Sequence, residues 1–130
     1  MKKGIAIAVL FFFVLGWAIT EHLLLDRFFG HMTAECAAIQ IMLDEDTEHI
    51  DRPAVIARAD ALTSYFDGHR HGLQISVNQI LINDLAYRVV SLSTHTRQND
   101  YNMAGTDITC ITENCKLLHD QTMPTWSNVL

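Results

Sequence analysis

Two histidines separated by one residue, His69 and His71, form the pair with the clearest metal-binding chemistry in the sequence. Neutral imidazoles bind transition metals, and an extended loop can point both rings at one ion. The third ligand would come from one of three distant histidines: His49, His95 or His119. A lone pair of histidines is a weak metal signal, so an exposed polar turn is the competing interpretation and the one we favour.

The three cysteines offer a disulfide or a nucleophile. Cys110 and Cys115 are five residues apart, which places them about 140° apart around a helix and disfavours a bond between them. Cys36 and Cys110 each lie on the apolar stripe of a predicted helix, so a Cys36–Cys110 disulfide is compatible with an exported domain. Buried free thiols are the alternative, because cysteine packs as a small hydrophobe. For nucleophilic chemistry the local candidate is Cys115, which has His119 four residues later.

Motifs that mark common enzyme sites are missing from the sequence. It contains no His-Glu-x-x-His zinc motif, no Gly-x-Ser-x-Gly elbow and no glycine-rich phosphate loop. The acidic residues are scattered, so no pair of carboxylates can be singled out for hydrolysis. We therefore predict no enzymatic activity and no cofactor.

Composition narrows the function classes further. Of the 130 residues 49% are hydrophobic, and 9 basic against 15 acidic residues give a net charge of -6. Such a chain lacks the basic face that neutralises phosphates, which argues against a nucleic-acid partner. Its apolar content excludes a disordered chain, and its three cysteines exclude a disulfide-dense scaffold.

The N-terminal region predicts a membrane anchor over residues 1–25. Lys2 and Lys3 precede an uncharged run, residues 4–20, which covers about 25 Å as a helix and is lengthened by three leucines at 23–25. The alternative is a signal peptide cleaved after Ala18, but the run exceeds the roughly 7–15 apolar residues typical of one. Because basic flanks stay in the cytoplasm, the lysines predict a single-pass plasma-membrane protein with residues 26–130 exported.

The exported region has helical periodicity. From the membrane run onward, apolar residues recur at alternating steps of four and three residues, the signature of a helix that meets other helices. These residues are Leu25, Phe29, Met32, Cys36, Ile39 and Leu43, so one helix should leave the bilayer and continue to about Leu43. A second helix starts at Asp51-Arg52-Pro53, carries the stripe Val55, Ala59, Leu62 and Phe66, and ends at Asp67-Gly68.

Two further helices complete the predicted set. The third runs from His71 or Leu73 to Ser93, with a wide apolar face made by Val77, Ile80, Leu81, Leu85, Val89 and Leu92 and extended by Ile75, Ile82 and Ala86. The fourth begins at Asn99-Asp100 and ends near Asp120, with a stripe of Met103, Asp107, Cys110, Ile111 and Leu118. The predicted fold is all-α: an N-terminal transmembrane helix that continues into an extracytoplasmic antiparallel bundle of about four helices.

The C-terminal residues carry a resemblance. They read Thr125-Trp126-Ser127-Asn128-Val129-Leu130, close to an ending Thr-x-x-Asn-Ile-Leu or Phe. With the lysine-led apolar N-terminus and these helix lengths, the chain resembles a domain-of-unknown-function family, number 4363, of short membrane-anchored proteins from Gram-positive bacteria. It departs from that family at Phe66, where members have a tryptophan, and at Asn78-Gln79, where they tend to have Asp-His. The resemblance implies an all-helical exported domain with no known activity and hints at a membrane partner.

Three function hypotheses follow, and the third, a small envelope hydrolase, would require a cleft. The first is a non-enzymatic interaction or accessory subunit that binds another membrane or envelope protein, or a second copy of itself. Its candidate contacts are Trp126, Val129 and Leu130, because apolar residues at a free terminus favour burial; docking on their own bundle is the alternative. The second hypothesis is a metal- or pH-responsive sensor domain that uses His69, His71 and a further histidine.

Overall fold

The computed structural model describes residues 1–45, 47–76 and 79–122. These residues form four α-helices and one short 3-10 helix, and no strand occurs among them. The helices are α1 (Lys2–Leu43), α2 (Arg52–Ser76), α3 (Gln79–Arg97) and α4 (Tyr101–Thr122), with η1 (Thr47–His49) between the first two. The prediction of an all-α chain is confirmed for the described residues.

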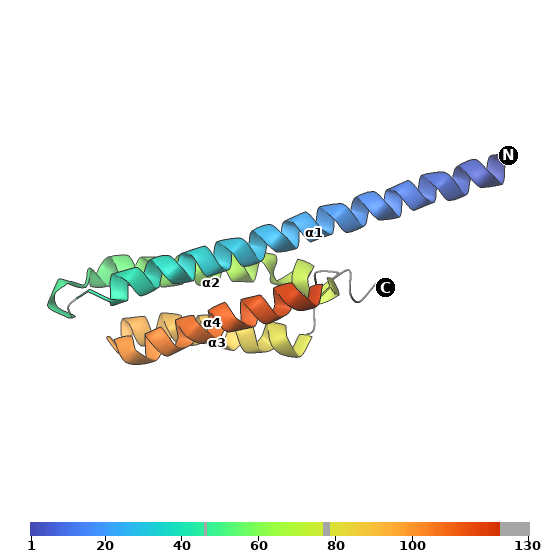
Figure 1. Cartoon of the computed structure of the whole chain (residues 1–130). Coiled ribbons are helices and arrows are strands. Elements are labelled where there is room, and N and C mark those ends of the chain that lie inside the picture. The colour runs from blue at the N-terminus through green and yellow to red at the C-terminus, as the bar shows by residue number, and fades with distance from the viewer. Residues whose placement is uncertain (46, 77–78, 123–130) are drawn as a thin grey trace.

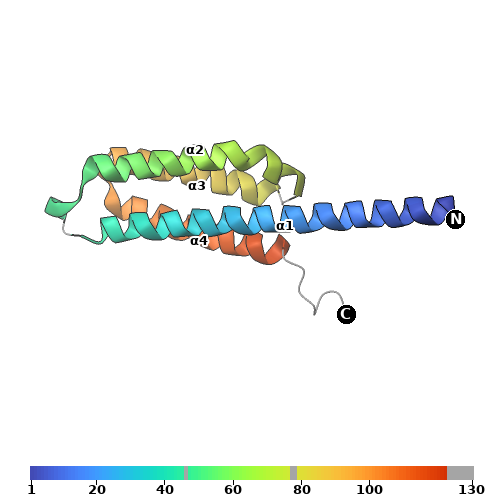
Figure 2. The same cartoon turned by 90° about the horizontal axis from the view of Figure 1, so that it is seen from above.

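The four helices lie side by side, and successive helices run in opposite directions (Figures 1 and 2). α1 packs against α2 and α4, and α3 completes the ring by packing against the same two helices. The N-terminal half of α1 extends beyond the other three helices and has no neighbour among the other described residues (Figure 1). One core therefore forms between four helices, and one half-helix stands outside it.

The predicted seam on α1 forms its buried face. Phe29, Met32, Cys36 and Ile39 are buried, while Leu25 and Leu43 at the two ends are half-buried against the same core. Phe28 is also buried, which widens the face near the point where α1 meets the bundle. A repeat of about 3.5 residues keeps one face of a helix turned toward its neighbours, and the core of this bundle requires that geometry.

α2 begins as predicted but ends later. The Asp51 carboxylate caps the helix by accepting a hydrogen bond from the Ala54 amide at 3.3 Å, and all four residues of the predicted stripe are buried. The predicted end at Asp67-Gly68 is wrong, because Gly68 keeps helical backbone angles and the helix continues to Ser76. Leu73 is buried two turns beyond Phe66, so packing of this last segment favours continuation over a glycine stop.

α3 is shifted relative to its predicted range. It begins at Gln79 and ends at Arg97, and its buried residues are Ile82, Leu85, Val89, Leu92 and Thr96. Ile80 was predicted in the core, but it is 78% exposed, because the buried face follows the 82-85-89-92 spacing instead. The predicted core residue Val77 and the side chain of Ile75 lie outside the described residues.

The turn between α3 and α4 depends on an asparagine. Asn99 has φ 60°, in the left-handed region that asparagine tolerates, and the Asp100 amide then donates to the His95 carbonyl at 3.0 Å. The Asp100 carboxylate next caps α4 by accepting from the Met103 amide at 3.2 Å. The predicted start of α4 is confirmed. Its buried stripe is Ala104, Asp107, Ile108, Ile111, Cys115 and Leu118, so Met103 and Cys110 lie off it, contrary to prediction.

Candidate functional site

The His69–His71 pair lies within α2 and not in a loop. Residues two apart on an α-helix point about 200° away from each other, so these rings cannot share one metal ion. His69 Nδ1 lies 2.8 Å from the Tyr65 carbonyl oxygen one turn earlier, while His71 is exposed. Within the described residues no three His, Cys, Asp or Glu side chains are arranged to hold a metal. The metal-sensing hypothesis was wrong about the loop it required; its pH-responsive form stays a prediction.

Cys36 shares the core with Cys115, whereas Cys110 is half-buried. All three cysteines are free, so the structure contains no Cys36–Cys110 disulfide. Cys36 and Cys115 are fully buried and close enough that a charge on Cys36 disfavours one on Cys115. Burial raises the pKa of each of these two thiols to about 12. Cys110 lies one position off the buried stripe of α4, which explains why the predicted pairing does not form.

The Cys115–His119 pair is not set up for nucleophilic catalysis. At neutral pH a thiol with a pKa of about 12 is protonated, and the thiolate is the nucleophile. His119 instead contacts acids: its Nε2 lies 3.0 Å from Asp26 Oδ1 on α1, and its Nδ1 lies 3.8 Å from Asp120 Oδ1. This imidazole therefore joins α4 to α1 at the end of the bundle nearest the apolar half-helix.

The described part of the core contains one fully buried carboxylate, Asp107 on α4. Three side chains of α3 donate to it. His95 Nδ1 lies 2.6 Å from Oδ2, Ser91 Oγ lies 3.1 Å from Oδ2, and Arg88 Nη1 lies 3.4 Å from Oδ1. Residues 88, 91 and 95 lie on one face of α3 because they are three and four apart. Together these contacts satisfy a buried charge and fix α3 against α4.

A serine, a histidine and an aspartate meet at this cluster, but not in the geometry of a hydrolase. In a Ser-His-Asp triad the serine and the acid bind opposite nitrogens of the imidazole. Here Ser91 Oγ lies 3.3 Å from the same His95 Nδ1 that contacts Asp107. The imidazole is therefore not placed to take a proton from Ser91 while Asp107 orients it.

Sequence reasoning missed the Asp107 cluster, although a signal was present. Asp107 stood on a predicted apolar stripe, and a charged residue in such a position requires a partner on a neighbouring helix. Arg88, Ser91 and His95 occur at helical spacing on the preceding helix. A hollow of about 360 Å³ beside the cluster is lined by Tyr87, Arg88, Ser91, Thr94, His95 and Met103.

A second cluster, of aromatic and histidine rings, lies between α1 and α2. The Tyr65 ring centroid lies 4.0 Å from that of His31 and 4.3 Å from that of His69. Phe28 stacks on Tyr65 with centroids 5.7 Å apart and planes 10° apart. Partial burial raises the pKa of the Tyr65 hydroxyl, which remains a hydrogen-bond donor. No periodicity could reveal this cluster, because it depends on how α1 and α2 align.

A groove adjoins these rings at the end of the bundle nearest the apolar half of α1. Its volume is about 350 Å³, and its lining comes from α1 and α2 alone: Glu21, Leu24, Leu25, Arg27, Phe28, Tyr65, His69, Gly72 and Leu73. His69 thus takes part in a site, as an aromatic neighbour and groove residue and not as a partner of His71.

The predicted contact residues Trp126, Val129 and Leu130 lie outside the described residues. Comparison with known proteins adds no relative: no family model, no curated protein and no solved structure matches the chain. The resemblance to the membrane-anchored family 4363 therefore stays a prediction from the sequence.

Proposed function

We propose that this chain is a single-pass membrane protein whose exported helical bundle binds another membrane or envelope protein without catalysing a reaction. The observation that carries the proposal is the N-terminal half of α1. Its most apolar 18-residue window has a mean hydropathy of 2.1, and none of it is buried against the other residues that the structure describes. A helix that is apolar all round requires an apolar surrounding, and a bilayer supplies one.

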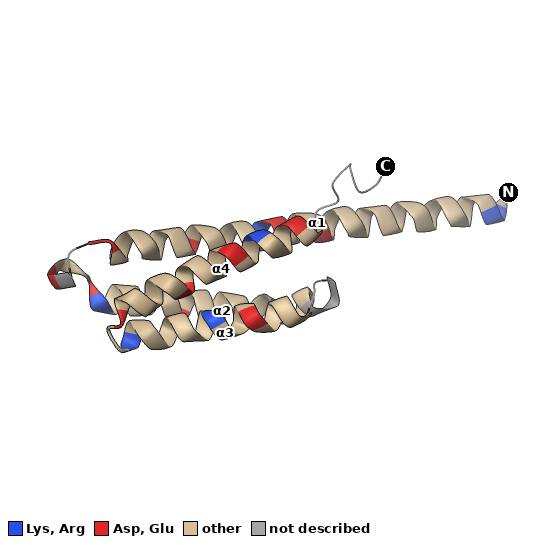
Figure 3. Cartoon of the chain, turned by 60° about the horizontal axis from the view of Figure 1, so that its bottom comes forward, with Lys and Arg blue, Asp and Glu red and all other residues tan. Residues whose placement is uncertain are grey.

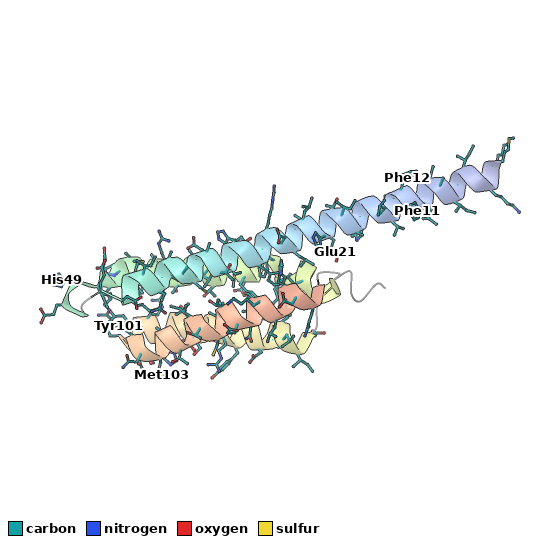
Figure 4. All side chains as sticks on the ribbon, viewed as in Figure 1. Phe11, Phe12, Glu21, His49, Tyr101 and Met103 are labelled. Atoms are coloured by element: carbon teal, nitrogen blue, oxygen red, sulfur yellow. The ribbon has the colours of Figure 1, made fainter. Side chains whose placement is uncertain are left out.

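Side chains and charges support a membrane-spanning segment. Phe11 and Phe12 are 62% and 69% exposed, and both lie far from the described parts of α2, α3 and α4 (Figure 4). Figure 3 shows no charged residue along the protruding part of α1 between its basic N-terminal tip and the bundle, and in the sequence the first charge after Lys3 is Glu21. This distribution favours lysines in the cytoplasm and the bundle on the opposite side.

Continuity of α1 gives the proposed anchor a structural role. The same helix that crosses the membrane also supplies one wall of the core, with Phe28, Met32 and Ile39 buried. No loop separates the two parts, so the bundle is held at a fixed height and direction relative to the membrane. This continuous helical connection suits a protein that presents one surface to a neighbour in the same membrane.

An exposed apolar patch on α3 and α4 is the proposed binding surface. Tyr87 is 66% exposed, Val90 lies one turn later at 55%, and Met103, which lines the same hollow as Tyr87, is 42% exposed. Tyrosine and methionine are enriched in protein interfaces, and Arg88 lies over the Tyr87 ring at 5.8 Å. The surroundings of Ser91 and Cys115 support the non-catalytic part of the proposal, because they do not activate either side chain as a nucleophile.

Cysteine labelling in intact cells tests the topology. A reporter cysteine replaces exposed Gln98 at the far end of the bundle, or Lys3 at the N-terminus, in a chain whose Cys110 is changed to serine. A membrane-impermeant maleimide should label Gln98→Cys in intact cells and Lys3→Cys only after lysis. Labelling of Gln98→Cys only after lysis, or recovery of the chain in the soluble fraction, would contradict the proposal.

Site-specific photocrosslinking tests the binding surface. A benzophenone amino acid at Tyr87 should form an adduct with a distinct membrane or envelope protein in intact cells, and Val90→Asp should remove that adduct. The same probe at Ala61, exposed on α2, is the matched control. Adducts of equal yield at both positions would refute this surface. Adducts with a second copy of the chain would replace the distinct partner by self-association.

A further inference from the structure

The groove between α1 and α2 has an apolar wall. Phe28 and Leu73 form its buried floor at 2% and 3% exposure, and Leu25 is half-buried beside them. With a volume of about 350 Å³, the groove lies within the range of small-molecule sites. Apolar surface in an open groove favours an apolar ligand, because its burial removes that surface from water.

Polar groups are placed at different heights along the groove. Arg27 forms no ion pair with any residue in the described part of the chain. Tyr65 and His69 also line the groove, and Tyr65 carries a hydroxyl donor. Glu21 lies about 9 Å closer to the N-terminus along the helix axis. An anionic group is therefore favoured beside Arg27 and disfavoured at the Glu21 end.

The groove is continuous with the proposed lipid-facing surface of α1. Leu23 and Leu24 are 55% and 61% exposed, and they connect the unburied half of the helix to Leu25 and Phe28. Since α1 enters the membrane toward its N-terminus, the Glu21 end of the groove faces the bilayer and the Arg27 end faces away. A lipid of the adjoining leaflet has the same polarity, with its chains toward the bilayer centre and its phosphate toward water.

We propose that this groove binds a phospholipid of the surrounding bilayer, with an acyl chain against Leu24, Leu25 and Leu73 and the phosphate beside Arg27. The inference rests on the proposed insertion of α1 in the membrane. A lipid bound here joins the end of α2 to α1 at the membrane surface. It thereby limits tilting of the bundle that presents the Tyr87 patch.

Gly72 provides a variant that fills the groove without breaking the helix. It lines the groove, and a Cβ added there meets no atom within 4 Å. Leucine is a better helix former than glycine, so Gly72→Leu occupies the groove without weakening α2. Gly68, one turn earlier, is also free of neighbours within 4 Å but does not line the groove, so Gly68→Leu is the matched control.

Photolabelling in vesicles tests the proposal with the full chain. The protein is reconstituted in phosphatidylcholine and phosphatidylglycerol vesicles that contain a trace of phospholipid with a diazirine in its acyl chain. Mass spectrometry then measures labelling of the α2 peptide that contains residues 65–73. Labelling should fall about tenfold in Gly72→Leu, and remain unchanged in Gly68→Leu. Arg27→Gln should lower labelling by an anionic phospholipid by about threefold.

Labelling of residues 4–20 in the same samples separates the two proposals. Strong labelling of residues 4–20 without labelling of the α2 peptide, or equal α2 labelling in both glycine variants, overturns the lipid site and leaves the anchor standing. Absence of label from residues 4–20 overturns the anchor and the lipid site together. A crosslink from a photoreactive residue at Leu73 to residues 123–130, or to a second copy, assigns the groove to that occupant and overturns the lipid.

Discussion

The two halves of α1 are both rich in apolar residues, yet they differ in what surrounds them. Residues 2–20 are exposed on every side, whereas residues 21–43 bury one face and expose the other. No loop or helix break separates the two halves. Apolar content alone therefore does not indicate whether a helical segment packs against protein or stands outside it.

The arrangement of apolar residues distinguishes the halves. In residues 4–20 they occupy all sides of the helix, so no single face can be covered by a neighbouring helix. From Leu25 to Leu43 they recur at alternating steps of four and three residues, and small side chains such as Ala34 and Ala37 lie on the exposed face, where Ile41 is the exception at 69% exposure. The pattern of residues 4–20 suits lipid, which surrounds a helix on all sides, and the pattern from Leu25 to Leu43 suits packing against α2 and α4 on one face.

Truncation of a phenylalanine should destabilise the fold when it lies in the second half of α1 and have almost no effect when it lies in the first half. Phe28→Ala removes a ring that is 2% exposed and should lower the free energy of unfolding by about 3–5 kcal/mol. Phe12→Ala, at a 69% exposed position, should change it by less than about 0.5 kcal/mol. Guanidinium unfolding of the full chain in micelles measures both changes in free energy, with alkylation of the buried Cys115 thiol as the readout of unfolding. Equal losses would show that the first half also packs in the fold.

An introduced charge should impair membrane insertion when it lies in the first half of α1 and leave insertion unchanged when it lies in the second half. Leu10→Arg places an arginine near the centre of the proposed span and should cost about 2.5–3.5 kcal/mol of insertion free energy. Ala34→Arg adds the same charge to the exposed face of the second half and should leave insertion unchanged. The fraction of chain that resists carbonate extraction from membranes reports the difference. If Leu10→Arg is retained as well as wild type, the first half does not span a bilayer.

The second half of α1 packs against α4, and the contacts of Asp107 fix α4 to α3. Asp107→Ala removes the acceptor of Arg88, Ser91 and His95 and should destabilise the bundle by about 2–3 kcal/mol. Asp26→Ala also removes an acid that pairs with a histidine, but its side chain is 60% exposed, so less than about 1 kcal/mol is expected. Chemical unfolding compares the two, and similar losses would contradict the assigned role of burial.

The smallest expected effect concerns the two buried thiols. The pKa of Cys36 and Cys115 rises from 9.0 to about 12 on folding, so the folded state keeps protons that the unfolded state loses. Stability is complete below pH 9 and falls as pH rises from about 9 to about 12, on the order of 1 kcal/mol per thiol at pH 10. In a Cys36→Ala, Cys115→Ala variant the slope of unfolding free energy over that interval should be smaller. An unchanged slope would mean that these thiols titrate normally in the fold.

Part of the fold was predictable because single residues enforce it locally. The Asp51 and Asp100 caps depend on a side chain and amides three residues away, and the seam of α1 depends on spacing alone. The end of α2 was not predictable in this way. Gly68 permits a stop but does not impose one, and burial of Leu73 against other helices favoured continuation. Propensity of one residue is a weak term when packing opposes it.

The candidate sites show the same division. His69 and His71 were predicted as a pair because one residue separates them in the sequence. The groove could not be predicted in this way, because it forms only when α1 and α2 align so that Arg27 and Phe28 meet Tyr65 and His69. That Cys36 and Cys115 lie together in the core as free thiols could not be predicted without knowing which face of α4 is buried. A shift of one residue along a helix rotates a side chain by about 100°, which exceeds the precision of a stripe read from sequence.

By itself, the sequence determined that the chain is helical, that its first segment is apolar all round and that the next segment carries a seam. These properties follow from local backbone preference and from the spacing of apolar residues, which neighbouring residues fix. Only the tertiary structure decided that Asp107 meets His95, that Cys115 lies beside Cys36, and that a groove opens beside Tyr65. Each depends on the relative rotation and height of two helices, and those are set by the packing of the whole core.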